Sequence, residues 1–291
     1  MIDQIQDTIY ALAASGAAIY AARASGLYRS DDEGKTWHDV LASLGSLSSL
    51  ALSAPSMVTA VAADGDTLLA GTNGAVLRST DSGDTWQIVP LSSPPPQVSA
   101  LVISPNFRED GVVLAGTAQD GVFVSTDRGA TFIPWNFGLL DLNVYALAIS
   151  PDFPRDQVIF AGTLSGIFRS TNGGRSWRET SFPMDAAPVL SLAIASNGSI
   201  YAGTEAHGLF VSDDFGATWR QVGELGAVGV NALQIRDGSI WSLAENRVAR
   251  GDGAIWLHHE SLPADKVGIA LLPLSSGLLV GCADGALLHL P

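Results

Sequence analysis

The chain has 291 residues, of which 47% are hydrophobic and only 15% are charged, so it is long and apolar enough to fold around a sizeable core. Its 15 basic and 29 acidic residues give a formal charge of −14, which excludes a basic nucleic-acid surface and opposes binding to an anionic membrane. Cys282 is the single cysteine, which excludes an intrachain disulfide and a cysteine-based zinc cluster.

The first residues, MIDQIQDTIYALAAS, have no basic segment ahead of their apolar stretch and so do not match a signal peptide. A transmembrane helix needs a run of about 18 apolar residues, and the sequence contains none. We therefore expect a cytoplasmic or otherwise soluble protein that does not insert into a membrane.

An internal repeat begins at Ile9 and continues to the end of the chain. Each unit contains four short segments of strand-forming residues separated by Gly, Asn, Asp or Ser. The first is an apolar run such as VYALAIS, the second reads (I/L)xAGT, the third reads GxFxS, and the fourth begins at an aromatic residue. The seven units open at Ile9, Val58, Val98, Val144, Val189, Val230 and Val267.

Four antiparallel strands in each period of about 40–45 residues are typical of a propeller blade, as in WD40 and YVTN-like repeats. We predict one all-β domain spanning 1–291, a seven-bladed β-propeller of four-stranded antiparallel blades. The seventh unit stops after three strands, so residues 1–6 are predicted to complete the last blade and close the ring; six blades are the alternative. The predicted blades cover approximately 9–43, 57–92, 97–139, 143–183, 188–226, 229–263, and 267–290 plus 1–6.

An octapeptide of the form S-x-D-x-G-x-T-W occurs five times, as SDDEGKTW, STDSGDTW, STDRGATF, STNGGRSW and SDDFGATW. We interpret it as the hairpin between the third and fourth strands, with glycine at positive φ, the Asp or Asn accepting backbone hydrogen bonds and the aromatic ring wedged between blades. A calcium loop would need alternating oxygen ligands and a distant Glu, so no metal is predicted. The structural residues are Asp32, Asp81, Asp127, Asn172 and Asp214, with Trp37, Trp86, Phe132, Trp177 and Trp219.

This octapeptide is the Asp-box, and the chain resembles the BNR/Asp-box propellers. These include sialidases, xyloglucan-active hydrolases, sortilin-type receptors and Ycf48-like photosystem II assembly factors, and no one subfamily is favoured. In those families the box is structural and lies away from the ligand. The resemblance therefore implies a ligand site at the channel mouth on the opposite face.

That face is expected to carry the turns between second and third strands and the connections between blades. The four acidic candidates on this face, which come from different blades, would give the channel mouth a negative potential able to attract a cation, an amine or a basic peptide. They are Asp120, Glu205, Glu245 and Asp284. Alternatively, they are solvated turn residues, and the aromatic residues are plugs folded against blade edges. The candidate rim residues are Asn73, Asp120, Glu205, His207, Glu245, Asp284, Trp135 and Phe137.

We predict a non-catalytic binding or scaffold propeller for a protein, small-molecule or glycan partner. The alternative is a glycoside hydrolase that uses rim carboxylates. No catalytic residue and no cofactor are assigned, because no nucleophile accompanies His207 and the arginine-bearing segment of sialidases is missing. His258 and His259 are adjacent in a predicted strand and would point to opposite faces, which disfavours a metal pair.

Overall fold

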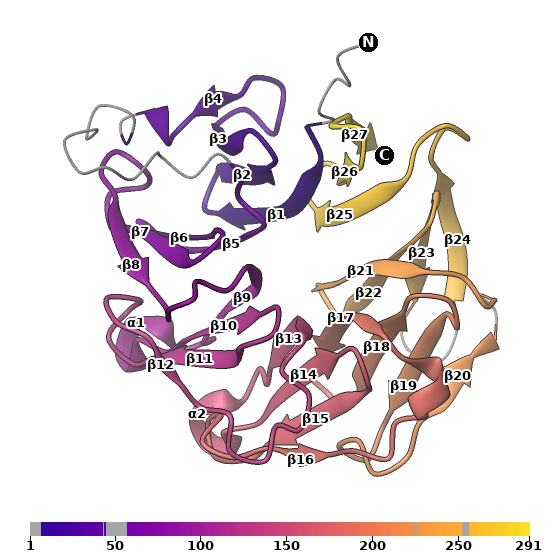
Figure 1. The fold of residues 1–291 in the computed structure, drawn as a ribbon. Helices are drawn as coiled ribbons and strands as arrows, with labels where there is room; N and C mark the ends of the chain where they lie inside the picture. The colour runs from indigo at the N-terminus through magenta and orange to yellow at the C-terminus, as the bar shows by residue number, and fades with distance from the viewer. Residues whose placement is uncertain (1–6, 43, 45–56, 224–225, 252–255) are drawn as a thin grey trace.

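The structure, a computed structural model, describes residues 7–42, 44, 57–223, 226–251 and 256–291 as a ring of seven antiparallel sheets (Figure 1). Within each sheet the strands follow chain order from the centre outward. The first strands contact one another around the ring and line a central channel. The predicted all-β, seven-bladed propeller is therefore confirmed.

The first four blades each contain four strands. Blade one has β1 (Ile9–Ser15), β2 (Ala18–Arg23), β3 (Gly26–Ser30) and β4 (His38–Asp39), and blade two has β5 (Ala60–Asp64), β6 (Thr67–Gly71), β7 (Ala75–Ser79) and β8 (Gln87–Pro90). Blade three has β9 (Val98–Ile103), β10 (Val113–Thr117), β11 (Gly121–Ser125) and β12 (Ile133–Pro134), and blade four has β13 (Val144–Ile149), β14 (Ile159–Thr163), β15 (Ile167–Ser170) and β16 (Arg178–Glu179).

The last three blades complete the ring. Blade five has β17 (Val189–Ile194), β18 (Ile200–Thr204), β19 (Leu209–Ser212) and β20 (Arg220–Val222). Blade six has β21 (Val230–Arg236), β22 (Ser239–Ala244), β23 (Arg247–Gly251) and β24 (Trp256–Ser261), and blade seven has β25 (Gly268–Pro273), β26 (Leu278–Cys282) and β27 (Leu287–Leu290). The fourth strand predicted for blade seven, residues 1–6, lies outside the described residues.

Blades one and seven meet side by side, with β1 against β25 (Figure 1). The Thr8 hydroxyl donates to the Ala283 carbonyl oxygen at 2.6 Å. Ile9, which is fully buried, packs against Gly281 of blade seven. These contacts join residues from opposite ends of the sequence and close the ring.

The glycines of the AGT segments in blades two to five, and Gly281 at the same position in blade seven, make room for the next blade. A Cβ added to any of these glycines would lie 2.5–2.8 Å from the Val or Ile that opens the following first strand, closer than real Cβ contacts. Between blades six and seven the sizes are exchanged: Leu243 occupies the glycine position, and Gly268 faces it in place of valine. The regular pairs are Gly71–Val98, Gly116–Val144, Gly162–Val189, Gly203–Val230 and Gly281–Ile9.

Short helical segments interrupt the strands in the described part of the chain. The helices α1 (Phe107–Asp110) and α2 (Phe153–Asp156) lie in the connections between the first and second strands of blades three and four, and each buries its phenylalanine. A 3-10 turn, η2 (Met184–Ala186), lies between blades four and five. Among the described residues, none of the helices is long and apolar enough to span a bilayer.

Candidate functional site

Antiparallel pairing gives the propeller two distinct faces. The Asp-box turns and the connections between first and second strands lie at one end of the sheets, which we call the Asp-box face. The turns between second and third strands and the connections from blade to blade lie at the other end, which we call the connection face. The predicted rim residues belong to the connection face.

In the second Asp-box, side chains and backbone form a closed set of hydrogen bonds. Asp81 Oδ1 accepts from the Ser79 hydroxyl at 2.7 Å and from the Thr85 backbone N–H at 2.9 Å, and Asp81 Oδ2 accepts from the Thr85 hydroxyl at 2.5 Å. Ser79 Oγ in turn accepts from the Gly83 N–H at 2.9 Å. The bonds from Ser79 and Thr85 lower the pKa of the Asp81 carboxyl to about 2. Both carboxylate oxygens of Asp81 therefore accept hydrogen bonds from within the turn.

The aromatic residue of the box reaches the preceding blade. The ring of Trp86 is buried, and its Nε1–H donates to the carbonyl oxygens of Val40, at 2.8 Å, and Gly83, at 2.9 Å. Trp177 Nε1–H donates in the same way to the Trp135 carbonyl oxygen at 2.7 Å. In these two boxes the turn therefore fastens the blade to the preceding one.

The residue before the box glycine also has positive φ, which the sequence analysis missed. The backbone carbonyl oxygen of this residue accepts a hydrogen bond from an arginine in the third strand of the preceding blade. Arg29, Arg78 and Arg169 each make this bond, at 2.7–3.2 Å, which accounts for the arginines at that strand position. These arginines therefore join neighbouring blades. The residues concerned are Glu33, Ser82, Arg128, Gly173 and Phe215, with φ between 58° and 73°.

The low pKa of Asp81 predicts a pH dependence of stability. An unfolded Asp has a pKa of about 3.9, so the folded carboxylate contributes stability above that pH and loses it as the pH falls toward 2. Asp81→Asn is expected to make the acid-side fall in unfolding free energy less steep while preserving the turn, because Asn172 occupies the same position in the fourth box. Urea denaturation at several pH values between about 2 and 6, the range in which the Asp81 carboxyl titrates in the folded and unfolded states, measures the unfolding free energy of both proteins.

Asp84→Asn is the matched control, since Asp84 lies in the same turn and its side chain accepts none of the turn's hydrogen bonds described above. A wild-type acid slope in Asp81→Asn, or an equal change in Asp84→Asn, would contradict the prediction.

The structure spreads the predicted rim residues over separate blades. Asp120 Oδ2 accepts from the Ser92 hydroxyl at 2.6 Å, and Asp284 pairs with Lys266, which lowers the pKa of the Asp284 carboxyl. In the described part of the chain, no three His, Cys, Asp or Glu side chains gather to hold a metal ion. Asn73, Glu205, His207 and Glu245 lie in exposed turns of blades two, five and six.

The two aromatic candidates behave differently from each other. Trp135 is half-buried against Val122 and Trp177, and the Arg175 guanidinium lies 5.1 Å from its ring centre. Phe137, two residues later, is 82% exposed. Only Phe137 therefore offers a free aromatic surface.

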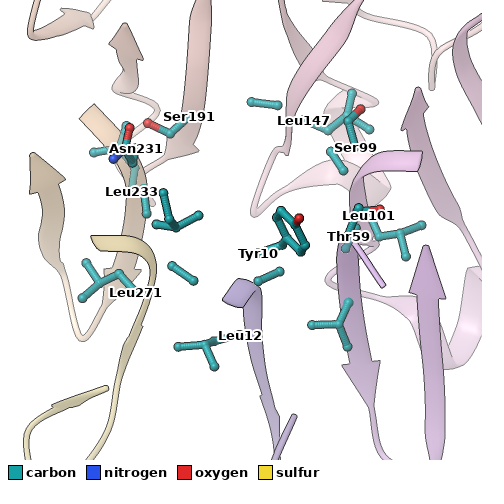
Figure 2. Close-up of a pocket in the computed structure, with 18 of the residues that line it drawn as sticks. Tyr10, Leu12, Thr59, Ser99, Leu101, Leu147, Ser191, Asn231, Leu233 and Leu271 are labelled. Atoms are coloured by element: carbon teal, nitrogen blue, oxygen red, sulfur yellow. The ribbon is translucent and has the colours of Figure 1, made fainter. Parts of the chain in front are cut away.

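The channel holds a cavity of about 250 Å³ lined by first strands of all seven blades (Figure 2). Its polar side chains bond to the next blade: Thr59 to the Val98 carbonyl oxygen, Ser99 to Val144, Ser191 to Val230, and Asn231 Nδ2–H to Gly268. Tyr10 projects into the middle of the cavity (Figure 2). No charged residue is among the described residues that line it. We call these bonds between neighbouring first strands the channel belt. The sequence analysis missed it, although all four polar residues lie near the start of the apolar segment that opens each repeat.

One aliphatic residue from each first strand surrounds the channel, and each is at most 9% exposed. Leu12, Leu101, Leu147, Leu233 and Leu271 are labelled around Tyr10 in Figure 2. Each belongs to a different cluster of the core, so the channel wall is continuous with the packing between blades. The seven residues are Leu12, Val61, Leu101, Leu147, Leu192, Leu233 and Leu271.

The connection between blades three and four and the adjacent β14–β15 turn carry four exposed or partly exposed apolar residues, Phe137, Leu140, Leu142 and Leu164, which we group as the apolar patch. Phe137 and Leu140 are 82% and 80% exposed, and Leu142 and Leu164 are partly exposed. The first three lie in the connection between blades three and four, and Leu164 lies in the adjacent β14–β15 turn. The sequence analysis named only Phe137, because exposure of leucines in a loop depends on how the loop folds.

Hydrogen bonds hold the patch in place on both sides. The Leu142 carbonyl oxygen accepts from the Gly121 N–H of blade three at 3.0 Å. On the blade-four side, the Leu164 N–H donates to the Asn143 carbonyl oxygen at 3.1 Å, and Asp141 Oδ2 accepts from the Ser165 N–H at 2.8 Å. The apolar side chains therefore stand on an ordered connection.

The fold and turns define the class: the chain is a seven-bladed β-propeller whose third and fourth strands are joined by Asp-box turns. Residues 28–39 match the BNR/Asp-box repeat, and residues 209–222 match the BNR-Asp box repeat. The chain is thus a BNR/Asp-box propeller, as the octapeptides predict, without assignment to a subfamily. No curated protein sequence matches it.

Several solved structures share the fold. Ycf48 bound to a D1 peptide superposes with a TM-score of 0.73 at 15% identity, covering 98% of this chain and 94% of that one. The GH74 xyloglucanase from Xanthomonas campestris gives 0.77 at 18% identity, and this chain (97% covered) spans 52% of that enzyme. A catalytically inactive virginiamycin B lyase from Staphylococcus aureus with quinupristin gives 0.76 at 12% identity, covering 98% and 95%. At these low identities, the TM-scores establish a shared fold and nothing beyond it.

Proposed function

We propose that this propeller is a binding module that docks a protein partner at its connection face, with the apolar patch as the main contact. The observation that carries the proposal is the exposure of Phe137 and Leu140, at 82% and 80%, on a connection hydrogen-bonded to both neighbouring blades. Large exposed side chains on an ordered surface can be buried by a partner at little cost in conformational entropy. Ycf48 bound to a D1 peptide supports this use of the fold.

The partner's chemistry follows from the charges around the patch. Asp120 and Asp141 lie in the neighbouring turn and connection, and the chain as a whole carries −14. Complementary charge speeds encounter and suppresses wrong partners. We therefore expect a partner segment with apolar side chains for the patch and basic residues beside them.

The glycoside hydrolase alternative draws support from the xyloglucanase likeness but has weaker geometric support. A glycosidase of the usual kind needs two carboxyl groups about 5–10 Å apart at the scissile bond. The described lining of the channel cavity contains no Asp or Glu, and Lys266 pairs with Asp284. Turnover of chromogenic glycosides that is abolished by Glu205→Gln would overturn the proposal and restore this alternative.

The patch is tested by crosslinking followed by affinity measurement. A photo-crosslinking residue at Leu140 is expected to capture a partner in extract from the source cells, whereas one at Leu257, 67% exposed on the outer strand of blade six, is not. With the captured protein purified, Phe137→Ala combined with Leu140→Ala is expected to weaken binding at least about tenfold, the effect of losing a central anchor.

Leu257→Ala is the control, because it removes an exposed leucine outside the patch. Equal binding by wild type and the patch variant, or equal weakening by Leu257→Ala, would count against the proposal.

A further inference from the structure

A second cavity, of about 420 Å³, lies on the Asp-box face between blades four and five. The connection between the first and second strands carries α2 in blade four but is only the short segment 195–199 in blade five, which leaves a step between the blades. Its apolar lining residues include Phe160, Ile194 and Ile200, of which Ile194 is partly exposed and the other two are fully buried. Its volume falls in the range of small-molecule sites, about 300–1,000 Å³.

Phe215 stands at the edge of this cavity in an unusual conformation. It has φ 58° and is 52% exposed, and Arg169 holds its carbonyl oxygen at 2.7 Å. Positive φ is unfavourable for a bulky residue, and the same position in the fourth box is Gly173. A Cβ placed on Gly198 would lie 3.8 Å from the Phe215 ring, so the ring extends along the rim toward blade five's short turn. The chain therefore presents an exposed aromatic surface at a site where glycine would be easier to accommodate.

The polar rim combines donors and acceptors, and its charged side chains are Arg155, Asp152 and Asp156. The Asp156 carboxylate accepts from the Ser150 hydroxyl and the Val158 N–H. Arg155 Nε donates to Asp152 Oδ1 at 2.7 Å, and both side chains are largely exposed. This pairing leaves the terminal guanidinium nitrogens and the second carboxylate oxygen facing solvent or a ligand. Asn197 Oδ1 accepts from the Ser199 N–H at 3.0 Å, so its amide hydrogens remain to be donated. Ser196 adds an exposed hydroxyl to the same wall.

We propose that this cavity binds a neutral sugar, with one pyranose ring stacked by its C–H face on Phe215. Each sugar hydroxyl both donates and accepts, which matches the mixed rim of Arg155, Asp152 and Asn197. Arg155 is paired with Asp152, and Asp156 adds a second carboxylate to the lining, which disfavours an anionic ligand. The exposed Phe215 ring and the partly exposed Ile194 offer apolar surface that a purely polar ligand would leave unused. This site lies on the opposite face from the apolar patch and is independent of it.

Saturation-transfer NMR and calorimetry with cellobiose, lactose and maltose test the proposal. At least one of these sugars is expected to bind the full chain, with saturation transferred to its ring C–H protons. Phe215→Gly should weaken that binding about tenfold or more, the scale of a lost ring contact, and Phe215→Trp should retain it. Because glycine occupies the same turn position in the fourth box, Phe215→Gly should fold normally.

Ser82→Gly is the matched control, since it makes the same backbone change in the second box, away from this cavity. Asn197→Ala is expected to weaken binding without altering the aromatic surface. Failure of all three sugars to bind the wild type, or unchanged binding in Phe215→Gly, would overturn the proposal. Binding of indole with no binding of any sugar would overturn the assigned ligand class.

Discussion

Exchanging Leu243 for glycine and Gly268 for valine together is expected to restore stability that either substitution alone removes. Leu243 is fully buried, so Leu243→Gly should lower the unfolding free energy by about 3–5 kcal/mol through the cavity it leaves. A Cβ on Gly268 would lie 2.7 Å from Leu243 Cδ1, so Gly268→Val should cost about 1–3 kcal/mol by overpacking. The double variant recreates the Gly203–Val230 arrangement of the preceding pair of blades.

Urea denaturation of the wild type, both single variants and the double variant gives the coupling energy directly. We expect the double variant to be more stable than the sum of the single effects by about 1–3 kcal/mol, as for residues in contact. The pair Gly71→Ala and Gly223→Ala provides a control for glycine substitution itself. A Cβ on Gly71 would lie 2.5 Å from Val98, whereas one on Gly223 would meet nothing within 4 Å. Additive effects of Leu243→Gly and Gly268→Val would show that the two residues do not pack as a pair.

Trp86→Ala is expected to lower the unfolding free energy by about 3–5 kcal/mol. The ring is 8% exposed and packs in the core cluster shared by blades one and two. Its removal leaves a cavity between the blades and frees the Val40 carbonyl oxygen, to which the indole N–H donates at 2.8 Å. Chemical denaturation followed by far-ultraviolet circular dichroism measures the loss.

Trp86→Phe keeps a six-membered aromatic ring, as Phe132 does in the third box, and removes the five-membered ring with its N–H. Its cost should be smaller, about 1–3 kcal/mol, because most of the wedge remains and the Val40 and Gly83 carbonyl oxygens lose their donor. If Trp86→Ala lost no more stability than Trp86→Phe, the wedge between blades would not be the stabilising feature.

The turn chemistry was predictable because its hydrogen bonds are local. Ser79, Asp81, Gly83 and Thr85 lie within seven residues, so their spacing alone indicated an Asx-type turn with a glycine at positive φ. The positive φ of the residue before the glycine was not predictable. Side chains as different as those of Ser82 and Phe215 occupy that position, so residue type gives no signal. What these positions share is a hydrogen bond to the backbone carbonyl oxygen from an arginine of the neighbouring blade, which is visible only in the tertiary structure.

The candidate site was predicted only in part. The connection face followed from strand order, and exposure of Phe137 agrees with a contact role, which stays a proposal. Leu140 and Leu164 were missed because a loop leucine looks the same in sequence whether it is buried or exposed. The cavity beside Phe215 was also missed, since it depends on the step between α2 and a short turn in the next blade.

The sequence by itself determined the all-β class, the seven repeats, the order of strands within a blade and the structure of the Asp-box, because each depends on residues close together in the chain. Only the tertiary structure decided how the blades fit one another. The match of Gly281 to Ile9, the exchange of sizes at Leu243 and Gly268, and the belt of bonds around the channel join residues of different blades. Their complementarity is a property of side-chain volume and direction in space, which a one-dimensional pattern does not contain.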